Sequence, residues 1–262
     1  MGDHQRLVRL DRHEGGVIEW VLDRPEAMNA VSTEMAEALV AAGEELAADR
    51  SVRAVVVTSS SEKAFCVGAD LKERNGLTDD QLREQRPGNR RAYRALLELP
   101  VPTIAVVDGY ALGGGCELAL ACDLIVAGRR ATLALPEVGV GVIPGGGGTQ
   151  LMTRRIGWSR AADLIFTGRR VDADEAYRLG LVDRVEDDPR TAAMELAGQI
   201  AANSPIGVRN AKAAMRAGLD VSLDEGLDIE DERWHDTAFS ADRAEGVRAF
   251  AEKRRPRWPG LR

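Results

Sequence analysis

An α/β core followed by a helical C-terminal part is the fold class that the sequence predicts. Short β-rich runs alternate with helical patterns as far as about residue 190, which is typical of an α/β arrangement. From about Thr191 onward the strand signal disappears, and helical patterns separated by polar and glycine breakers take over. A chain of 262 residues is near the practical limit of one core. We therefore expect a core over residues 1–200 and a helical part over residues 201–262.

The first half of the expected core contains a hairpin, a helix and two buried strands. Residues 7–23 alternate between apolar and polar on either side of Glu14-Gly15-Gly16, which predicts two strands joined by a turn. Ser32 is placed to cap a helix with an apolar face. The runs 53–58 and 102–107 are apolar, as fully buried strands are.

The rest of the core is expected to begin with a charged excursion. Residues 72–91 are highly charged and contain glycine and proline breakers, so we expect an exposed segment that leads into a helix over 93–99. Strands are expected over 123–127 and 131–135. A glycine-rich loop over 139–148 follows them, and then another helix.

Composition excludes several classes of function. The net charge of −7 argues against nucleic acid or an anionic membrane as the default partner. No run approaches the roughly 18 apolar residues of a membrane span, and the first residues lack a signal-peptide pattern, so we expect a cytoplasmic protein. Three cysteines without C-x-x-C spacing and three histidines disfavour a disulfide framework, a metal site and a Ser-His-Asp triad. Carboxylates would then have to carry out any proton transfer.

One glycine turn is suited to binding an anion. A buried strand ends at Val107, three glycines occupy positions 113–115, and an apolar helix begins near Cys116. This arrangement places free backbone N–H groups at a positive helix end, where a phosphate or a developing oxyanion can bind. Glu117 lies in the first turn of that helix, either as an acid stabilised by the helix dipole or as a catalytic group.

A second carboxylate, Glu137, stands among apolar residues between a strand and the glycine-rich loop. It is either a loop acid that faces water or the partner of Glu117. If the two share one pocket, repulsion and burial should raise one pKa, so that one glutamate donates a proton while the other accepts one.

Four ordered stretches, residues 23–29, 64–73, 109–117 and 135–150, resemble the crotonase family and in particular its enoyl-CoA hydratases. The resemblance covers nearly the whole chain, and four motifs in the family's order are far more specific than any one of them. It implies a spiral core of repeated ββα turns. It also implies a C-terminal helical part that packs between subunits, in homotrimers or dimers of trimers.

The same resemblance implies the site and its substrate. The family binds acyl-CoA thioesters and holds the thioester oxygen with two backbone N–H groups, which match Val67 and Gly114. The glutamates of its hydratases match Glu117 and Glu137, and a water-holding glycine matches Gly145.

Coenzyme A is part of the substrate, so no separate cofactor is implied. Its binding segments match Glu26, Ala27, Met28, Gly68, Ala69, Asp70 and Leu71. An aromatic residue and a lysine near the C-terminus, compared with Phe250 and Lys253, can reach a neighbouring subunit's coenzyme A in this family.

The function predicted on this basis is reversible addition of water across the 2,3-double bond of a 2-enoyl-CoA. Retention of both glutamates favours hydration over double-bond isomerisation, which often dispenses with the equivalent of Glu117. Residues 68–74 also resemble the methylglutaconyl-CoA hydratase branch, so that substrate stays open. An alternative of a different class is a non-catalytic relative that binds RNA, for which the acidic chain offers little support.

Overall fold

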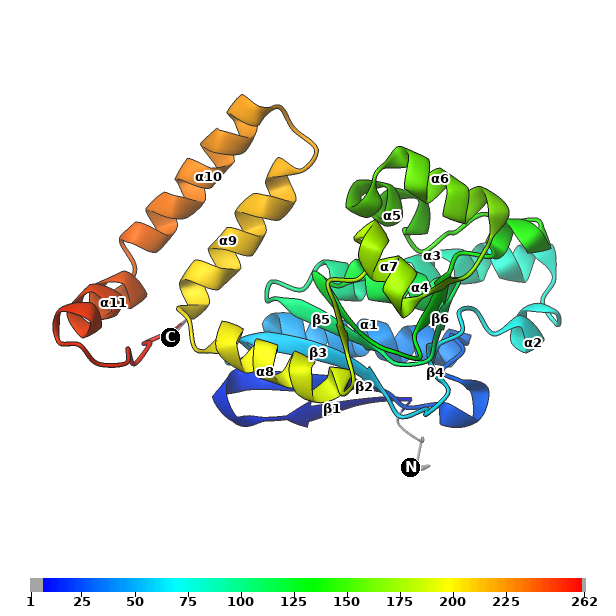
Figure 1. The fold of residues 1–262 in the computed structure, drawn as a ribbon, viewed down its shortest axis with the longest axis horizontal. Helices are drawn as coiled ribbons and strands as arrows, with labels where there is room; N and C mark the ends of the chain where they lie inside the picture. Colours follow the sequence, from blue (N-terminus) through cyan, green and yellow to red (C-terminus); the bar gives the residue numbers. More distant parts are fainter. Residues whose placement is uncertain (1–6, 261–262) are drawn as a thin grey trace.

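The computed structural model describes residues 7–260, in which two β-sheets and their connecting helices form the core (Figure 1). The larger sheet has the spatial order β1 (Val8–Arg12), β2 (Val17–Leu22), β3 (Ala54–Ser59), β5 (Thr103–Val107), β7 (Leu124–Gly128) and β10 (Arg184–Glu186). The smaller sheet has the order β4 (Ala64–Cys66), β6 (Tyr110–Leu112), β8 (Thr132–Ala134) and β9 (Val171–Asp172). Neighbouring strands are parallel except in the pairs β1–β2 and β8–β9.

From β3 to β8, successive strands alternate between the two sheets. In the larger sheet β3, β5 and β7 are each followed by a strand of the smaller sheet, namely β4, β6 and β8. Helices then return the chain to the larger sheet, as parallel pairing requires. The core is therefore a spiral of ββα turns, which confirms the fold expected from the crotonase resemblance.

Eight helices of the core lie within the described residues, and the first of them follows the sequence pattern closely. Those of the core are α1 (Thr33–Ala48), α2 (Leu71–Arg74), α3 (Asp79–Leu97), α4 (Gly114–Ala121), α5 (Gly148–Ile156), α6 (Trp158–Thr167), α7 (Ala173–Leu179) and α8 (Pro189–Ala201). Short 3-10 turns occur at η1 (Glu14–Gly16), η2 (Pro25–Ala27) and η3 (Glu137–Val140). The expected cap of α1 is present, because the Ser32 hydroxyl accepts a hydrogen bond from the Met35 N–H at 3.2 Å. Within residues 7–260, no helix combines the length and apolarity needed to cross a membrane.

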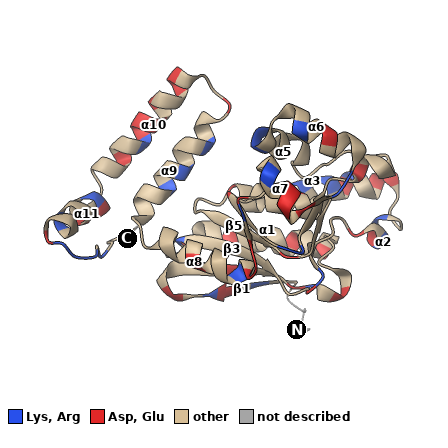
Figure 2. Cartoon of the chain, in the orientation of Figure 1, with Lys and Arg blue, Asp and Glu red and all other residues tan. Residues whose placement is uncertain are grey.

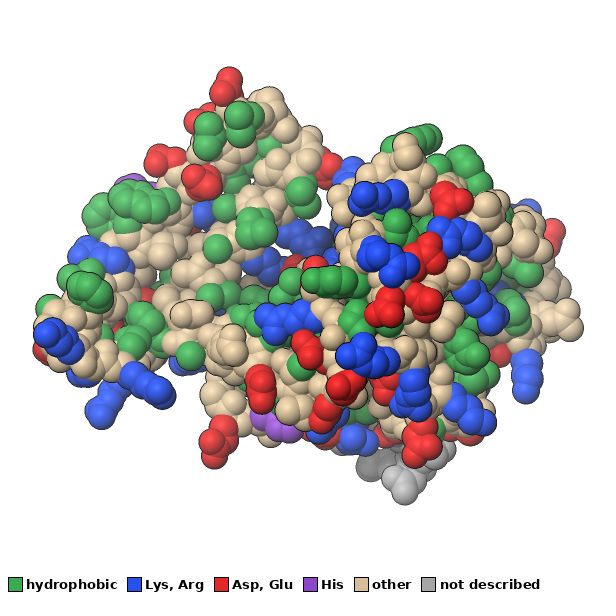
Figure 3. Space-filling view, in the orientation of Figure 1, with side chains coloured by type: hydrophobic (Ala, Val, Ile, Leu, Met, Phe, Trp, Pro, Cys, Tyr) green, Lys and Arg blue, Asp and Glu red, His purple; other side chains and the backbone are tan. Residues whose placement is uncertain are grey.

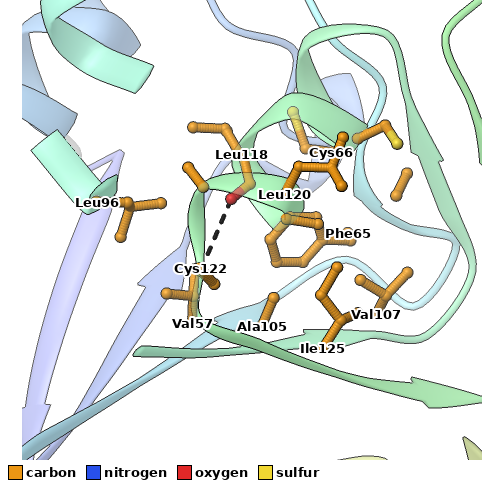
Figure 4. Packing of buried hydrophobic residues seen from close by; sticks show 14 of the residues in the cluster. Val57, Phe65, Cys66, Leu96, Ala105, Val107, Leu118, Leu120, Cys122 and Ile125 are labelled. Carbon is orange, nitrogen blue, oxygen red and sulfur yellow. Dashed lines mark hydrogen bonds between the residues drawn. The ribbon is translucent and has the colours of Figure 1, made fainter. Parts of the chain in front are cut away.

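The centre of the core lies between α4 and the larger sheet. Figure 4 shows Phe65 of β4 among Leu118 and Leu120 of α4, with Val107 and Ile125 of the larger sheet close by. All eight residues of α4 are buried, as expected for a helix that is apolar on every side. The single carboxylate of this helix must therefore find polar partners inside the protein.

The segment over residues 72–91 is largely exposed, as expected, and Gly76 lies between α2 and α3. The expectation that Pro87 and Gly88 also break the backbone is wrong, and the helix expected over 93–99 is the end of a longer one. α3 runs through both Pro87 and Gly88 without ending. A capping box formed by Thr78 and Gln81 begins the helix, and its buried face packs against α1. Cap and packing offset the backbone hydrogen bond that the proline cannot donate.

The last three helices extend away from the core, as Figure 1 shows. They are α9 (Pro205–Gly218), α10 (Leu223–Ala238) and α11 (Ala241–Ala251), and α9 lies beside α10. Lys212 of α9 donates to the Asp123 carboxylate at 2.6 Å, and Arg216 donates to its other oxygen at 2.9 Å. These ion pairs hold α9 against the edge of the core. That residues 201–262 form a domain of their own stays a prediction.

Candidate active site

Glu117 is positioned by the glycine turn between β6 and α4. Gly113 has a φ of 53°, a backbone conformation that favours glycine, and α4 begins at the next residue. A Cβ on Gly115 would lie only 1.9 Å from the Cys66 carbonyl oxygen, so the helix start packs directly on β4. This packing buries the first turn of α4 and leaves Glu117 only 3% exposed.

The buried carboxylate of Glu117 is held by the glycine-rich loop. Its Oε1 atom accepts hydrogen bonds from the Gly146 N–H at 2.6 Å and the Gly148 N–H at 2.8 Å. Burial raises the pKa of Glu117, while these two donors and the positive charge of Arg86 act in the opposite direction. Two backbone donors on one oxygen stabilise the ionised carboxylate.

Glu137 has the opposite environment. It opens η3 directly after β8 and is half-buried. Its Oε2 atom is sealed from solvent without a hydrogen-bond partner among the described residues. Burial raises the pKa of Glu137 to about 7; its own backbone N–H acts in the opposite direction, and the negative charge of Glu117 adds to the rise. A buried carboxyl group with one unpaired oxygen is more easily protonated.

The two glutamates flank the same turn. The Glu137 Oε1 atom lies 3.1 Å from the position that a Cβ on Gly113 would occupy, and Glu117 lies four residues further along that turn. The sequence-predicted pair is thus brought together: Glu117 accepts hydrogen bonds from two loop N–H groups, whereas Glu137 keeps one buried oxygen unpaired among the described residues. This contrast can separate an acid from a base.

Gly114 and Val67 also meet at this turn. A Cβ on Gly68 would lie 2.9 Å from the Gly114 nitrogen, so the segment after β4 runs against the start of α4. The Gly114 N–H has no acceptor among the residues that the structure describes. The Val67 N–H, in contrast, donates to the Met28 carbonyl oxygen at 3.2 Å. Of the two expected oxyanion donors, the Gly114 N–H is therefore free among the described residues. The Val67 N–H would have to give up a long hydrogen bond to Met28 before it could bind a substrate oxygen.

The segments expected to bind coenzyme A lie side by side. An isolated bridge joins Val31 to Ala69, which sets residues 26–28 next to residues 68–71. Arg24 donates to the Asp70 carboxylate at 2.8 Å, and this contact, ahead of all others, lowers the pKa of Asp70. Met28 and Leu71 are 38% and 63% exposed, so this surface is open to a ligand.

Three contacts at the site are not predicted by the sequence motifs. The N–H groups of Gly146 and Gly148 hold Glu117, although only their neighbour Gly145 was expected at the site. The Gly145 carbonyl accepts from Arg86 of α3 at 2.7 Å. Tyr93 of α3 packs against the same loop. A run of four glycines indicates close packing, but nothing in the sequence indicates that α3 supplies the packing partner.

No group of three or more histidine, cysteine or acidic side chains suited to a metal ion occurs within residues 7–260. The polar groups that converge at the site are the two carboxylates and the backbone donors described above.

Known proteins resemble this chain over nearly its full length. A family model described as enoyl-CoA hydratase/isomerase matches residues 12–261. A Bacillus subtilis protein named as an enoyl-CoA hydratase/isomerase is 48% identical over 242 residues, which are 92% of this chain and 93% of that protein. The mitochondrial methylglutaconyl-CoA hydratase of Mus musculus is 39% identical, over 98% of this chain and 84% of that protein.

Solved structures agree with the sequence comparison. The crystal structure of an enoyl-CoA hydratase from Bacillus anthracis is 41% identical, has a TM-score of 0.94, and covers 97% of this chain and 99% of that chain. Because the family model, the relatives and the fold all match over almost every residue, the chain belongs to the enoyl-CoA hydratase/isomerase family.

Proposed function

We propose that this protein is an enoyl-CoA hydratase, a hydro-lyase that adds water reversibly across the 2,3-double bond of a 2-enoyl-CoA. The observation that carries the proposal is the pair Glu117 and Glu137, which flank one glycine turn in opposite environments. The names of the relatives support the same reaction. Neither isomerisation nor RNA binding is favoured by any contact at the site.

Water addition builds negative charge on the thioester oxygen, because the reaction passes through an enolate. The free Gly114 N–H is suited to stabilise that oxygen. The Val67 N–H would join it by exchanging the Met28 carbonyl for the substrate, which is possible because their hydrogen bond is long, at 3.2 Å. One such donor is typically worth about 3 kcal/mol in the transition state.

The glutamates then divide the proton transfers. The ionised Glu117 takes a proton from the water whose oxygen bonds to C3, and the protonated Glu137 delivers its proton to C2. Burial favours the protonated form of both glutamates, but at Glu117 two loop N–H groups oppose it and favour the ionised form. Solvent must afterwards return each carboxyl group to its starting state. The water is proposed to lie beside Gly145, which is next to these donors and matches the family's water-holding glycine.

The remaining parts of the proposal concern binding and assembly. Coenzyme A would lie along residues 26–28 and 68–71, with no separate cofactor and no metal. The chain would assemble as a homotrimer or a dimer of trimers through its helical part. A cytoplasmic location stays a prediction.

The test replaces each glutamate by its isosteric amide. Glu117→Gln and Glu137→Gln should each lower kcat for crotonyl-CoA hydration by about 10²- to 10⁴-fold, the usual contribution of a positioned acid or base. The loss of absorbance of the conjugated thioester measures the rate, in buffer that holds only protein, substrate and a chelator. Glu37→Gln on the exposed face of α1 is the matched control. Full activity in either site variant contradicts the two-glutamate mechanism.

A substrate panel defines the acyl group. Crotonyl-CoA, longer straight-chain 2-enoyl-CoAs and 3-methylglutaconyl-CoA are compared by kcat/KM, and the products are identified. Double-bond migration without 3-hydroxyacyl product would favour the isomerase alternative, and absence of turnover with every thioester would overturn the proposed function.

A further inference from the structure

Tyr93 of α3 is fitted between the two glycine segments of the site. A Cβ on Gly114 would lie 2.1 Å from the Tyr93 hydroxyl oxygen, and a Cβ on Gly146 would lie 2.6 Å from its ring. Neither approach is possible with a side chain larger than hydrogen. The ring thus packs on the loop that holds Glu117, and the hydroxyl lies beside the residue with the free N–H.

The hydroxyl of this buried side chain has no hydrogen-bond partner within residues 7–260. Tyr93 is only 7% exposed, and its hydroxyl makes no hydrogen bond with any residue that the structure describes. Among the described residues, polar side-chain atoms that are fully buried and have no hydrogen-bond partner occur only in Trp20, Glu137 and Arg209. The Tyr93 oxygen also has no partner but is not among these atoms, so it must be accessible to solvent. Water or a bound ligand must accept its hydrogen bond, because a polar group left unpaired at this depth costs free energy.

Tyr93 is also a donor at any relevant pH. Burial, together with the negative charges of Glu117 and Glu137, raises the pKa of its hydroxyl. Because the charges of both carboxylates affect this pKa, the hydroxyl lies near the reacting centre. Neither carboxylate accepts a hydrogen bond from it. The part of the chain that the structure describes therefore offers this donor no acceptor.

We propose that the Tyr93 hydroxyl donates a hydrogen bond to the thioester oxygen of the bound acyl-CoA, beside the Gly114 N–H, as a third donor to the enolate. The inference rests on the proposed function. An acyl chain is apolar and offers no hydrogen-bond acceptor. The thioester oxygen, in contrast, gains negative charge during the reaction, and it would lie at the Gly114 N–H, beside the Tyr93 hydroxyl. The bond strengthens as the charge develops, so it acts on kcat more than on substrate binding.

Tyr93→Phe tests the proposal, because it keeps the ring between the two glycines and removes only the hydroxyl. A hydrogen bond to a charged acceptor corresponds to about 10- to 100-fold, so we expect kcat for crotonyl-CoA to fall by that factor with little change in KM. Tyr177→Phe, at an exposed position of α7, is the matched control and should behave as the unchanged protein. Thermal unfolding of each variant reports on the fold.

A second readout separates this role from a structural one. The enolate of acetoacetyl-CoA carries charge on the thioester oxygen, and its ultraviolet absorbance reports binding directly. Tyr93→Phe should weaken enolate binding by the same 10- to 100-fold and leave the affinity for free coenzyme A unchanged. Unchanged kcat and enolate affinity overturn the inference, and so does an equal loss of affinity for enolate and coenzyme A.

The outcomes also distinguish this inference from the proposed function. If the unchanged protein hydrates no enoyl-CoA but binds the enolate in a Tyr93-dependent way, the proposed function fails and the inference stands. If hydration is normal in both the unchanged protein and Tyr93→Phe, the inference alone fails.

Discussion

Glu117 and Glu137 are the same chemical group, and their surroundings make them different acids. Glu117 accepts two backbone hydrogen bonds on one oxygen, which offset part of the cost of burying its charge. Among the described residues Glu137 Oε2 has no donor, and the negative charge of Glu117 adds to the effect of burial, which the backbone N–H of Glu137 only partly offsets. A proton shared by the pair should therefore reside mainly on Glu137.

The pH dependence of hydration follows from this assignment. Glu137 must carry a proton to deliver it, and its pKa is about 7, so it is protonated below that pH and loses the proton above it. We expect kcat/KM for hydration to fall as the pH rises through about 7, because kcat/KM reports groups of the free enzyme. Initial rates between about pH 5.5 and 9, each checked for enzyme stability, measure the profile. A profile that is flat above pH 7 would show that Glu137 is not the acid.

At the scale of elements, the close contact between α4 and β4 determines where the site forms. A Cβ on Gly115 would meet the Cys66 carbonyl oxygen and carbon, which are backbone atoms that side-chain rotation cannot move. A Cβ on Gly88 within α3 would meet nothing within 4 Å. The same substitution at these two helical positions should therefore have opposite effects.

We expect Gly115→Ala to lower the free energy of unfolding by about 3 kcal/mol, since overpacking a tight contact typically costs 1–3 kcal/mol or more. Gly88→Ala should raise it by about 0.5–1 kcal/mol through the better helix propensity of alanine. Urea denaturation of both variants measures the difference. Equal stabilities would mean that α4 does not depend on this contact.

At the scale of the whole molecule, helices α9 to α11 expose many large apolar side chains. A protein that stays monomeric rarely leaves such a surface in contact with water. Large apolar side chains more than half exposed on this part are Met215, Leu219, Leu223, Leu227, Trp234, Phe239, Val247 and Phe250. Figure 3 shows hydrophobic side chains on the α9–α11 part, and Figure 2 shows acidic residues along α10. An apolar surface with charges beside it is typical of a subunit interface.

We expect the protein to sediment as three or six copies of the chain. Met215 of α9 is 74% exposed, so Met215→Asp should disrupt an interface without disturbing the core and shift the mass toward a single chain. Analytical ultracentrifugation measures the mass, and circular dichroism of the variant serves as the folding control. A monomer at micromolar concentration in the unchanged protein would contradict the proposed assembly.

Local signals account for the elements that the sequence predicted. The Ser32 cap, the N-terminal hairpin and the apolar strands 53–58 and 102–107 all depend on periodicity or on residues a few positions apart. Only the end of α3 is predicted, because Pro87 and Gly88 are local breakers, whereas the contacts that keep the helix intact come from α1, which is distant in sequence. The structure also brings Glu117 and Glu137 to the same turn, although no local pattern in the sequence predicts that they meet there.

The amino-acid sequence establishes which chemistry is available to this protein. Few histidines leave carboxylates for proton transfer, and a strand, a glycine turn and a helix start place backbone donors beside one of them. The folded structure shows that the loop N–H groups hold Glu117 and that Tyr93 fits between Gly114 and Gly146. The physical reason is that burial and charge act through space, so a pKa or a missing hydrogen-bond partner depends on residues that the chain order does not place together.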